Sequence, residues 1–233
     1  DKMFYPQLAS NRPDAMSELG IYGAVYKIAI VMVMFTQAFR FAYEPFIFAR
    51  NKDAGDGNKK SYSDAMKYFI IFGLFIFLAV MFYIDLVRFF MPATYCTGLK
   101  VVPIVMLAEL FFGVFFNLSL WYKLTDRTQW GAWFSLFGFA ITAIINIVGV
   151  PRFGYMACAW GAFVCYASMM LASFFIGQRV YPIRYDLKSA FRYTLLTVVL
   201  YAVAMVVPIE SLFLRLAFRT LLLGVFLVCL LYT

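Results

Sequence analysis

Four side chains that could bind a charged ligand fall within one apolar stretch, residues 20–50. They are Lys27, Gln37, Arg40 and Glu44. Ionised groups at membrane depth are unfavourable unless they face a partner charge, a bundle interior or a water-filled cavity. At about 100° per residue, Gln37, Arg40 and Glu44 lie within about 60° of one another on a helix. The stretch is therefore predicted to form a helix with a polar flank.

This flank is a candidate substrate-binding site for an anionic head group. Lysine and arginine bind phosphate, and arginine does so with two parallel hydrogen bonds. Lys27 is the stronger candidate, because it has no carboxylate at i±3 or i±4. Arg40 and Glu44 stand at i, i+4, so in the alternative interpretation they neutralise each other near the interface, where long side chains also reach water. The sequence leaves both interpretations open.

Polar residues in later apolar stretches are further candidates. Glu109 lies about two turns into its stretch. A buried carboxyl group favours its protonated form, so Glu109 and Glu44 are candidates for coupling transport to protons or sodium. Asn117 is a candidate sugar contact, although an amide at this depth also serves as a hydrogen bond between helices. Asp85 and Arg88, at i, i+3, are predicted to pair at the outer interface.

Several classes of chemistry are not expected from this composition. None of the 233 residues is a histidine, which excludes Ser-His-Asp and Cys-His nucleophiles and histidine-ligated metals in this chain. The four cysteines form no CxxC pair and are interpreted as small apolar packing residues. No catalytic residue, metal site or cofactor is predicted, and the protein is not expected to be an enzyme. The net charge of +8 comes without an RNA-binding motif, so no nucleic-acid partner is expected.

The composition indicates an integral membrane protein. Hydrophobic residues make up 64% of the chain and charged residues only 14%, whereas soluble domains are about half apolar and a quarter charged. Apolar stretches long enough to cross a bilayer recur along the chain. They predict an all-α, polytopic transmembrane helix bundle of about seven spans, at residues 20–49, 65–91, 101–122, 129–150, 155–177, 191–207 and 211–233.

The connections between these spans predict the orientation. Residues 51–63 are expected to be a polar loop, with Ser63 capping the next helix, and residues 151–154 a very short turn. Loop lysines and arginines concentrate after the first, third and fifth spans, which places those connections in the cytoplasm. The chain starts without methionine and stops directly after an apolar run, so a fragment of a longer membrane protein is expected.

Four blocks of sequence together carry a family resemblance. They are YKIAIVMVMFTQAFRFAYEPF at 26–46, WYKLTDRTQWGAW at 121–133, NIVGVPRFGYMACAW at 146–160 and GQRVYPIRYDLKSAFRY at 177–193. In this order they resemble bacterial polysaccharide-biosynthesis flippases of the multidrug/oligosaccharidyl-lipid/polysaccharide exporter superfamily. The chain is similar over nearly its whole length to the lipopolysaccharide or capsule exporters of Bacteroidetes-like bacteria.

The resemblance implies a multi-pass protein of the bacterial inner membrane, made of two pseudo-symmetric bundles around a central cavity. This chain would be the carboxy-terminal bundle, and the missing amino-terminal bundle would be its partner. The implied activity is the movement of an undecaprenyl-pyrophosphate-linked oligosaccharide from the cytoplasmic to the outer leaflet by alternating access, within the membrane lipids. Lys27 and Arg40 would meet the pyrophosphate, while Gln37, Asn117 and aromatic side chains would meet sugars.

Two alternatives remain open at this point. One is a multidrug/cation antiporter of the same superfamily, whose cavity would favour carboxylates over lysine and arginine. The other is a membrane-embedded polysaccharide polymerase or acyltransferase, which would need catalytic side chains in a sizeable outer loop or a histidine-bearing site. The longest internal loop is predicted to be cytoplasmic, and this disfavours such an enzyme.

Overall fold

All regular structure in the described part of the chain is helical. The computed structural model describes residues 15–50, 57–207 and 211–231. In chain order the elements are α2 (Ala15–Arg50), α3 (Gly57–Phe82), α4 (Ile84–Phe90), α5 (Ala93–Cys96), the 3-10 helix η1 (Thr97–Val101), α6 (Val102–Leu118), α7 (Leu120–Leu124), α8 (Gln129–Phe153), α9 (Tyr155–Val180), α10 (Leu187–Val206) and α11 (Leu212–Leu231). The described residues contain seven helical segments long and apolar enough to cross a membrane. The prediction of an all-α, polytopic bundle of about seven spans is confirmed.

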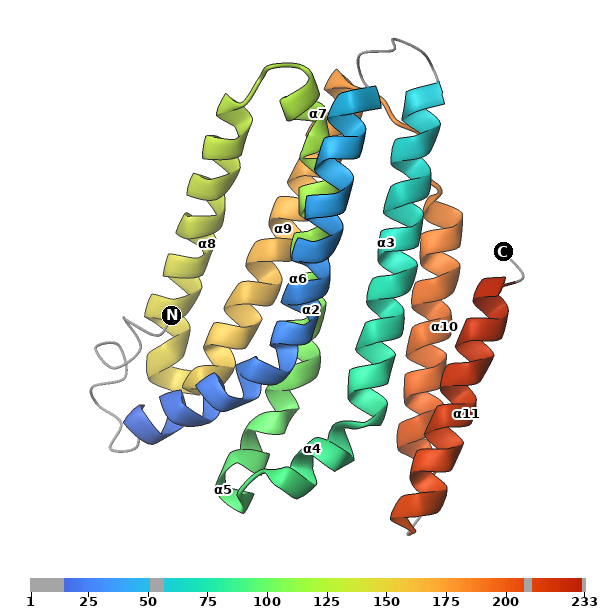
Figure 1. Cartoon of the computed structure of the whole chain (residues 1–233). Coiled ribbons are helices and arrows are strands. Elements are labelled where there is room, and N and C mark those ends of the chain that lie inside the picture. The colour runs from blue at the N-terminus through green and yellow to red at the C-terminus, as the bar shows by residue number, and fades with distance from the viewer. Residues whose placement is uncertain (1–14, 51–56, 208–210, 232–233) are drawn as a thin grey trace.

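Helix α6 is the central element of the bundle (Figure 1). Helices α2, α3 and α9 pack around it, and α8 forms an antiparallel hairpin with α9 on one side. On the other side, α10 packs on α3, and α11 packs on both α3 and α10. The span that contains α6 is accordingly the most buried of the seven in the described chain.

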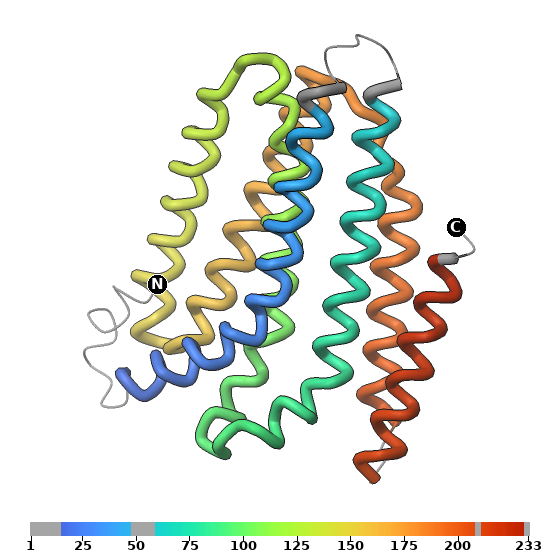
Figure 2. The backbone as a smooth tube through the Cα atoms, viewed as in Figure 1, coloured from blue at the N-terminus to red at the C-terminus, as the bar shows by residue number. Residues whose placement is uncertain are grey.

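Helix α2 is long and bent. Figure 2 shows its first part running across one end of the bundle before the rest rises along α6. Pro45 lies inside α2, which continues to Arg50, so the proline does not end the helix. Proline lacks the N–H that would bond to the Phe41 carbonyl. Since Pro45 and Phe41 are both exposed, the missing hydrogen bond falls on the outward face of α2.

The predicted loop at residues 51–63 is partly wrong. Helix α3 begins at Gly57, so residues 57–63 are helical, while residues 51–56 lie outside the described residues. Ser63 is not a helix cap, because it is buried within α3 and its hydroxyl donates to the Arg184 carbonyl at 2.8 Å. The first turns of α3 are polar, so the apolar pattern of the sequence does not predict them. The contact of Ser63 with the α9–α10 connection helps to stabilise this part of the helix.

The end of the second span and the turn after the fourth span also differ from the prediction. The helix of the second predicted span, 65–91, ends at Phe82, because Tyr83 departs from helical geometry and α4 then takes a new direction (Figure 1). The turn predicted at 151–154 contracts to Gly154 alone. Its φ of 60° and ψ of −143° are readily adopted only by glycine, so one residue suffices to reverse the chain between α8 and α9.

Small residues let the central helices approach closely. Ala157 and Ala159 of α9 are buried. Gly113 of α6 has the same role, because a Cβ atom there would collide with the Phe69 ring of α3 and lie 3.0 Å from Thr36 Oγ1 of α2. Close backbone approach of this kind is a main source of helix association in lipid. Gly113 therefore marks the point where α2, α3 and α6 meet.

We expect Gly113→Ala to lower the free energy of unfolding by about 1–3 kcal/mol, the usual cost of overpacking. Thermal unfolding of the protein in detergent measures this effect. Gly23→Ala is the matched control, because nothing lies within 4 Å of a Cβ atom at Gly23 of α2. Equal unfolding temperatures for the two variants would contradict the close packing at Gly113.

Candidate functional site

The polar flank of α2 carries an ion pair near its predicted cytoplasmic end. The Arg40 Nε donates to Glu44 Oε1 at 3.2 Å, so the i, i+4 pair permitted by the sequence forms. The Arg40 guanidinium also lies over the Phe116 ring of α6, 4.8 Å from its centroid. This contact favours a cation and holds the long side chain in one orientation. The flank is thereby anchored to α6.

Lys123 of α7 completes this cluster, and sequence reasoning did not select it. Its Nζ donates to Glu44 Oε1 at 2.5 Å, across 79 positions of sequence. The only sequence signal is a basic residue at the predicted cytoplasmic end of the third span, and it does not identify the partner. Side-chain exposures of 36% for Arg40, 28% for Glu44 and 25% for Lys123 leave the cluster within reach of solvent. Two cations share one carboxylate, so the cluster keeps a positive charge.

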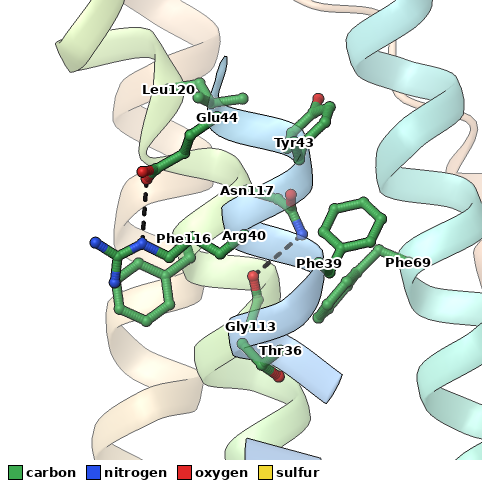
Figure 3. Close-up of a pocket in the computed structure, with 10 residues that line it drawn as sticks. All are labelled: Thr36, Phe39, Arg40, Tyr43, Glu44, Phe69, Gly113, Phe116, Asn117 and Leu120. Atoms are coloured by element: carbon green, nitrogen blue, oxygen red, sulfur yellow. Dashed lines mark hydrogen bonds and ion pairs between the residues drawn. The ribbon is translucent and has the colours of Figure 1, made fainter. Parts of the chain in front are cut away.

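A small cavity lies behind this cluster (Figure 3). Its volume of about 10 Å³ is close to the minimum that holds a single water. Asn117 and Thr36 line it, and the Asn117 amide donates to the Gly113 carbonyl of its own helix at 3.2 Å. Thr36 Oγ1 is buried and has no hydrogen-bond partner among the described residues. Asn117 is therefore held inside the bundle in this conformation, where a sugar does not fit.

Lys27 and Gln37 lie apart from the cluster. Lys27 is exposed and Gln37 is partly exposed, and no hydrogen bond or ion pair joins either one to another described side chain. At about 100° per residue, Lys27 is roughly 140° around α2 from Arg40. Its neighbours on the helix surface are apolar and exposed, among them Val31 and Met34. The predicted single flank is thus two features: a cluster directed toward α7, and a lone cation on the outward face.

Glu109 of α6 is buried against α2. The Tyr26 hydroxyl donates to Glu109 Oε1 at 2.8 Å, and the residue is only 6% exposed. Glu44, in contrast, faces two cations. The two candidates for ion coupling therefore sit in opposite environments.

A second charged cluster ties α11 to the start of α4. Arg219, 8% exposed, donates from Nη1 to Asp85 Oδ2 at 2.8 Å and to the Phe82 carbonyl at 2.9 Å. Arg215 Nη1 lies 3.2 Å from the same carboxylate oxygen. The predicted pair of Asp85 with Arg88 is wrong, because α4 turns Asp85 toward α11 and leaves Arg88 exposed. This cluster also carries more cations than carboxylates.

The arrangement is suited to binding anions and to holding helices together. Within residues 15–50, 57–207 and 211–231, no group of three or more cysteine, aspartate or glutamate side chains is placed to hold a metal ion. Among the buried polar groups, Glu109 and Arg219 are engaged in contacts between helices. Positive charge remains at the Arg40–Lys123 cluster, at the Arg215–Arg219 cluster and at Lys27.

We expect Asp85→Asn to destabilise the protein strongly, because it leaves the buried Arg219 charge without a counter-charge. Breaking a buried pair costs about 3–5 kcal/mol, and the effect here should fall at the lower end because Asp85 is 20% exposed. Denaturant unfolding in mixed micelles measures the change. Arg88→Gln is the control and should leave stability unchanged; an equal loss in both variants would contradict the assigned pairing.

No known protein family, curated protein or solved structure matches this chain. The seven span-capable segments of the described chain indicate a multi-pass membrane protein.

Proposed function

We propose that this chain is the carboxy-terminal bundle of a flippase in the bacterial inner membrane. Its substrate is an undecaprenyl-pyrophosphate-linked oligosaccharide, which moves from the cytoplasmic to the outer leaflet for surface polysaccharide synthesis. The amino-terminal bundle of the same protein forms the other half of the transport cavity. Alternating access of the two bundles moves the head group, and no covalent step is required.

The exposed position of Lys27 within a membrane-span segment is the main support for this proposal. Lys27 lies inside the segment Ala15–Ile47, is exposed, and is surrounded by exposed apolar side chains such as Val31 and Met34. A lone ammonium group facing hydrocarbon is unfavourable, so this face of α2 is better suited to a water-filled cavity or to another polypeptide. A cavity that accepts a pyrophosphate satisfies the charge of Lys27 directly.

The Arg40, Glu44 and Lys123 cluster supports the same proposal from the cytoplasmic end. The Glu44 carboxylate lies between two cations, Arg40 and Lys123, and pairs with both. A pyrophosphate presents similar oxygen acceptors with more charge, so it could replace Glu44 as the partner of Arg40. Cationic groups along the path offset the loss of hydration of the phosphates. An antiporter for cationic drugs would require the opposite charge at these positions.

In the complete protein, we expect Lys27→Ala to reduce surface polysaccharide roughly tenfold or more, because a hydrogen bond to a charged group contributes about 1.5–3 kcal/mol. Quantifying cell-surface glycan at equal protein abundance measures the loss. Lys27→Arg should retain most export, since the cation remains. Arg152→Ala removes an exposed cation at the end of α8 and serves as the matched control. Normal export by Lys27→Ala would contradict the phosphate role.

Glu109 supports a second element of the proposal, which is coupling of transport to a proton gradient. Its carboxyl group is buried and hydrogen-bonded to the Tyr26 hydroxyl, between the helix that carries Lys27 and the centre of the bundle. A change in its protonation would therefore alter the α2–α6 contact. The titratable Glu109 carboxyl group thus lies at a contact between two helices, α2 and α6, whose relative position could change during transport.

We expect transport by the wild-type protein in vesicles to rise with an imposed proton gradient, and transport by Glu109→Gln to lose that dependence. Glutamine keeps the shape and can still accept from Tyr26, so packing is preserved. A sodium gradient applied without a proton gradient distinguishes the two ions. Transport by the wild-type protein that is indifferent to both gradients would rule out coupling through Glu109.

A further inference from the structure

The Glu44 carboxylate is bound at only one of its two oxygens. Arg40 Nε donates to Oε1 at 3.2 Å, and Lys123 Nζ donates to the same oxygen at 2.5 Å. Within residues 15–50, 57–207 and 211–231, no hydrogen bond or ion pair reaches Oε2. Two cations from different helices therefore converge on a point that a single carboxylate oxygen occupies.

Both cations keep donors that Glu44 does not use. Arg40 engages Glu44 through Nε alone, and its two Nη atoms lie on the far side of the guanidinium from that bond (Figure 3). No group in the described part of the chain accepts a hydrogen bond from them. Lys123 has an ammonium group with three N–H donors, and Glu44 is its one acceptor among the described residues. Donors arranged in this way suit an anion with several oxygens, such as a phosphate group.

The bond between Arg40 and Glu44 is readily lost. Strong charge-assisted hydrogen bonds are about 2.7–2.9 Å long, and arginine often binds a carboxylate through two of them. Here there is one bond of 3.2 Å, between side chains that are 36% and 28% exposed. Exposed pairs at i, i+4 stabilise a helix only slightly, because water screens the charges. The Glu44 side chain can therefore turn toward water at small cost.

The two cations do not need Glu44 to stay near each other. The Arg40 guanidinium packs over the Phe116 ring of α6, 4.8 Å from its centroid, and this contact is independent of Glu44. Lys123 lies on α7, which follows α6 after Ser119 alone, and the Ser119 N–H bonds to the carbonyls of α6. The site is thus held in place before an anion arrives, which lowers the entropic cost of binding. Without Glu44 the like charges repel, so an incoming anion is favoured.

We propose that Glu44 is a built-in competitor for a diphosphate anion that Arg40 and Lys123 bind together. The anion displaces the Glu44 carboxylate, which then lies in water at the predicted cytoplasmic end of α2. Glu44 supplies the counter-charge whenever the anion is absent. This inference rests on the proposed function, because the pyrophosphate of the proposed substrate is the source of the diphosphate. It adds Lys123 as a contact and gives Glu44 a role opposite to that of a binding residue.

Titration of inorganic pyrophosphate into the purified full chain in an uncharged detergent, followed by calorimetry, tests the proposal. We expect Glu44→Gln to bind pyrophosphate roughly fivefold more tightly than the wild type, because it releases two cations from their ion pairs. Lys123→Gln should bind pyrophosphate roughly tenfold more weakly, since it loses a hydrogen bond from a charged group. If Glu44 only held α2 to α7, its replacement would not tighten binding.

Matched controls separate this site from the general charge of the protein. Asp126→Asn removes one carboxylate from the exposed connection after α7, and asparagine tolerates the φ of 54° at this position. Arg127→Gln removes one exposed cation from the same connection. Both control proteins should bind pyrophosphate as the wild type does. Phosphatidylglycerol in mixed micelles should displace little pyrophosphate, whereas complete displacement would assign the site to a bilayer lipid and overturn the proposal.

Pyrophosphate binding by Glu44→Gln that is unchanged or weaker, at an unfolding temperature equal to that of the wild type, would overturn the competitor role. If Glu44→Gln fails to fold, unchanged binding by Lys123→Gln would overturn the proposal instead. Neither result depends on transport. The proposed function is tested separately by export in the Lys27→Ala variant, which retains Arg40, Glu44 and Lys123.

Discussion

The absence of water in the membrane interior is the constraint on which this structure depends. Backbone groups in a span must bond within their own helix, and each charged side chain needs a counter-charge, a polar partner or access to water. The described residues meet this requirement mainly in clusters that join separate helices. The two clusters are Glu44 with Arg40 and Lys123, and Asp85 with Arg215 and Arg219. Each one connects segments that are distant in sequence.

Both clusters contain more cations than carboxylates. This excess of positive charge bears both on how the helices are held together and on the proposed function. In each cluster the carboxylate pairs with a cation on another helix, Glu44 of α2 with Lys123 of α7 and Asp85 of α4 with the two arginines of α11. The remaining positive charge lies near the two ends of the bundle, where lipid phosphates or a phosphorylated substrate would approach. Removing the carboxylate leaves like charges together, whereas an added anion could replace it. The same cluster can therefore hold the helices together and bind an anion, and this dual use is part of the proposed function.

The central helix α6 separates two surfaces with different requirements. On the α2 side, Lys27 faces outward among apolar residues. Its charge is unfavourable against hydrocarbon, so this surface suits water or a second polypeptide. On the other side, a groove between α9 and α10 is lined mainly by apolar side chains. Gly113 lets α2 and α3 approach α6 closely, while Glu109 and Tyr26 hold α2 to α6. Both surfaces therefore depend on the packing around one helix.

The length and spacing of apolar residues determined the all-α class and the number of spans, because a bilayer requires helices of a minimum length. Sequence spacing also identified the Arg40–Glu44 pair, since one turn of helix brings i and i+4 together. Only the tertiary structure paired Lys123 with Glu44 and Arg219 with Asp85, across 79 and 134 positions. It also ended α3 at Phe82. Contacts between helices depend on how whole helices pack, and local spacing carries no information about that packing.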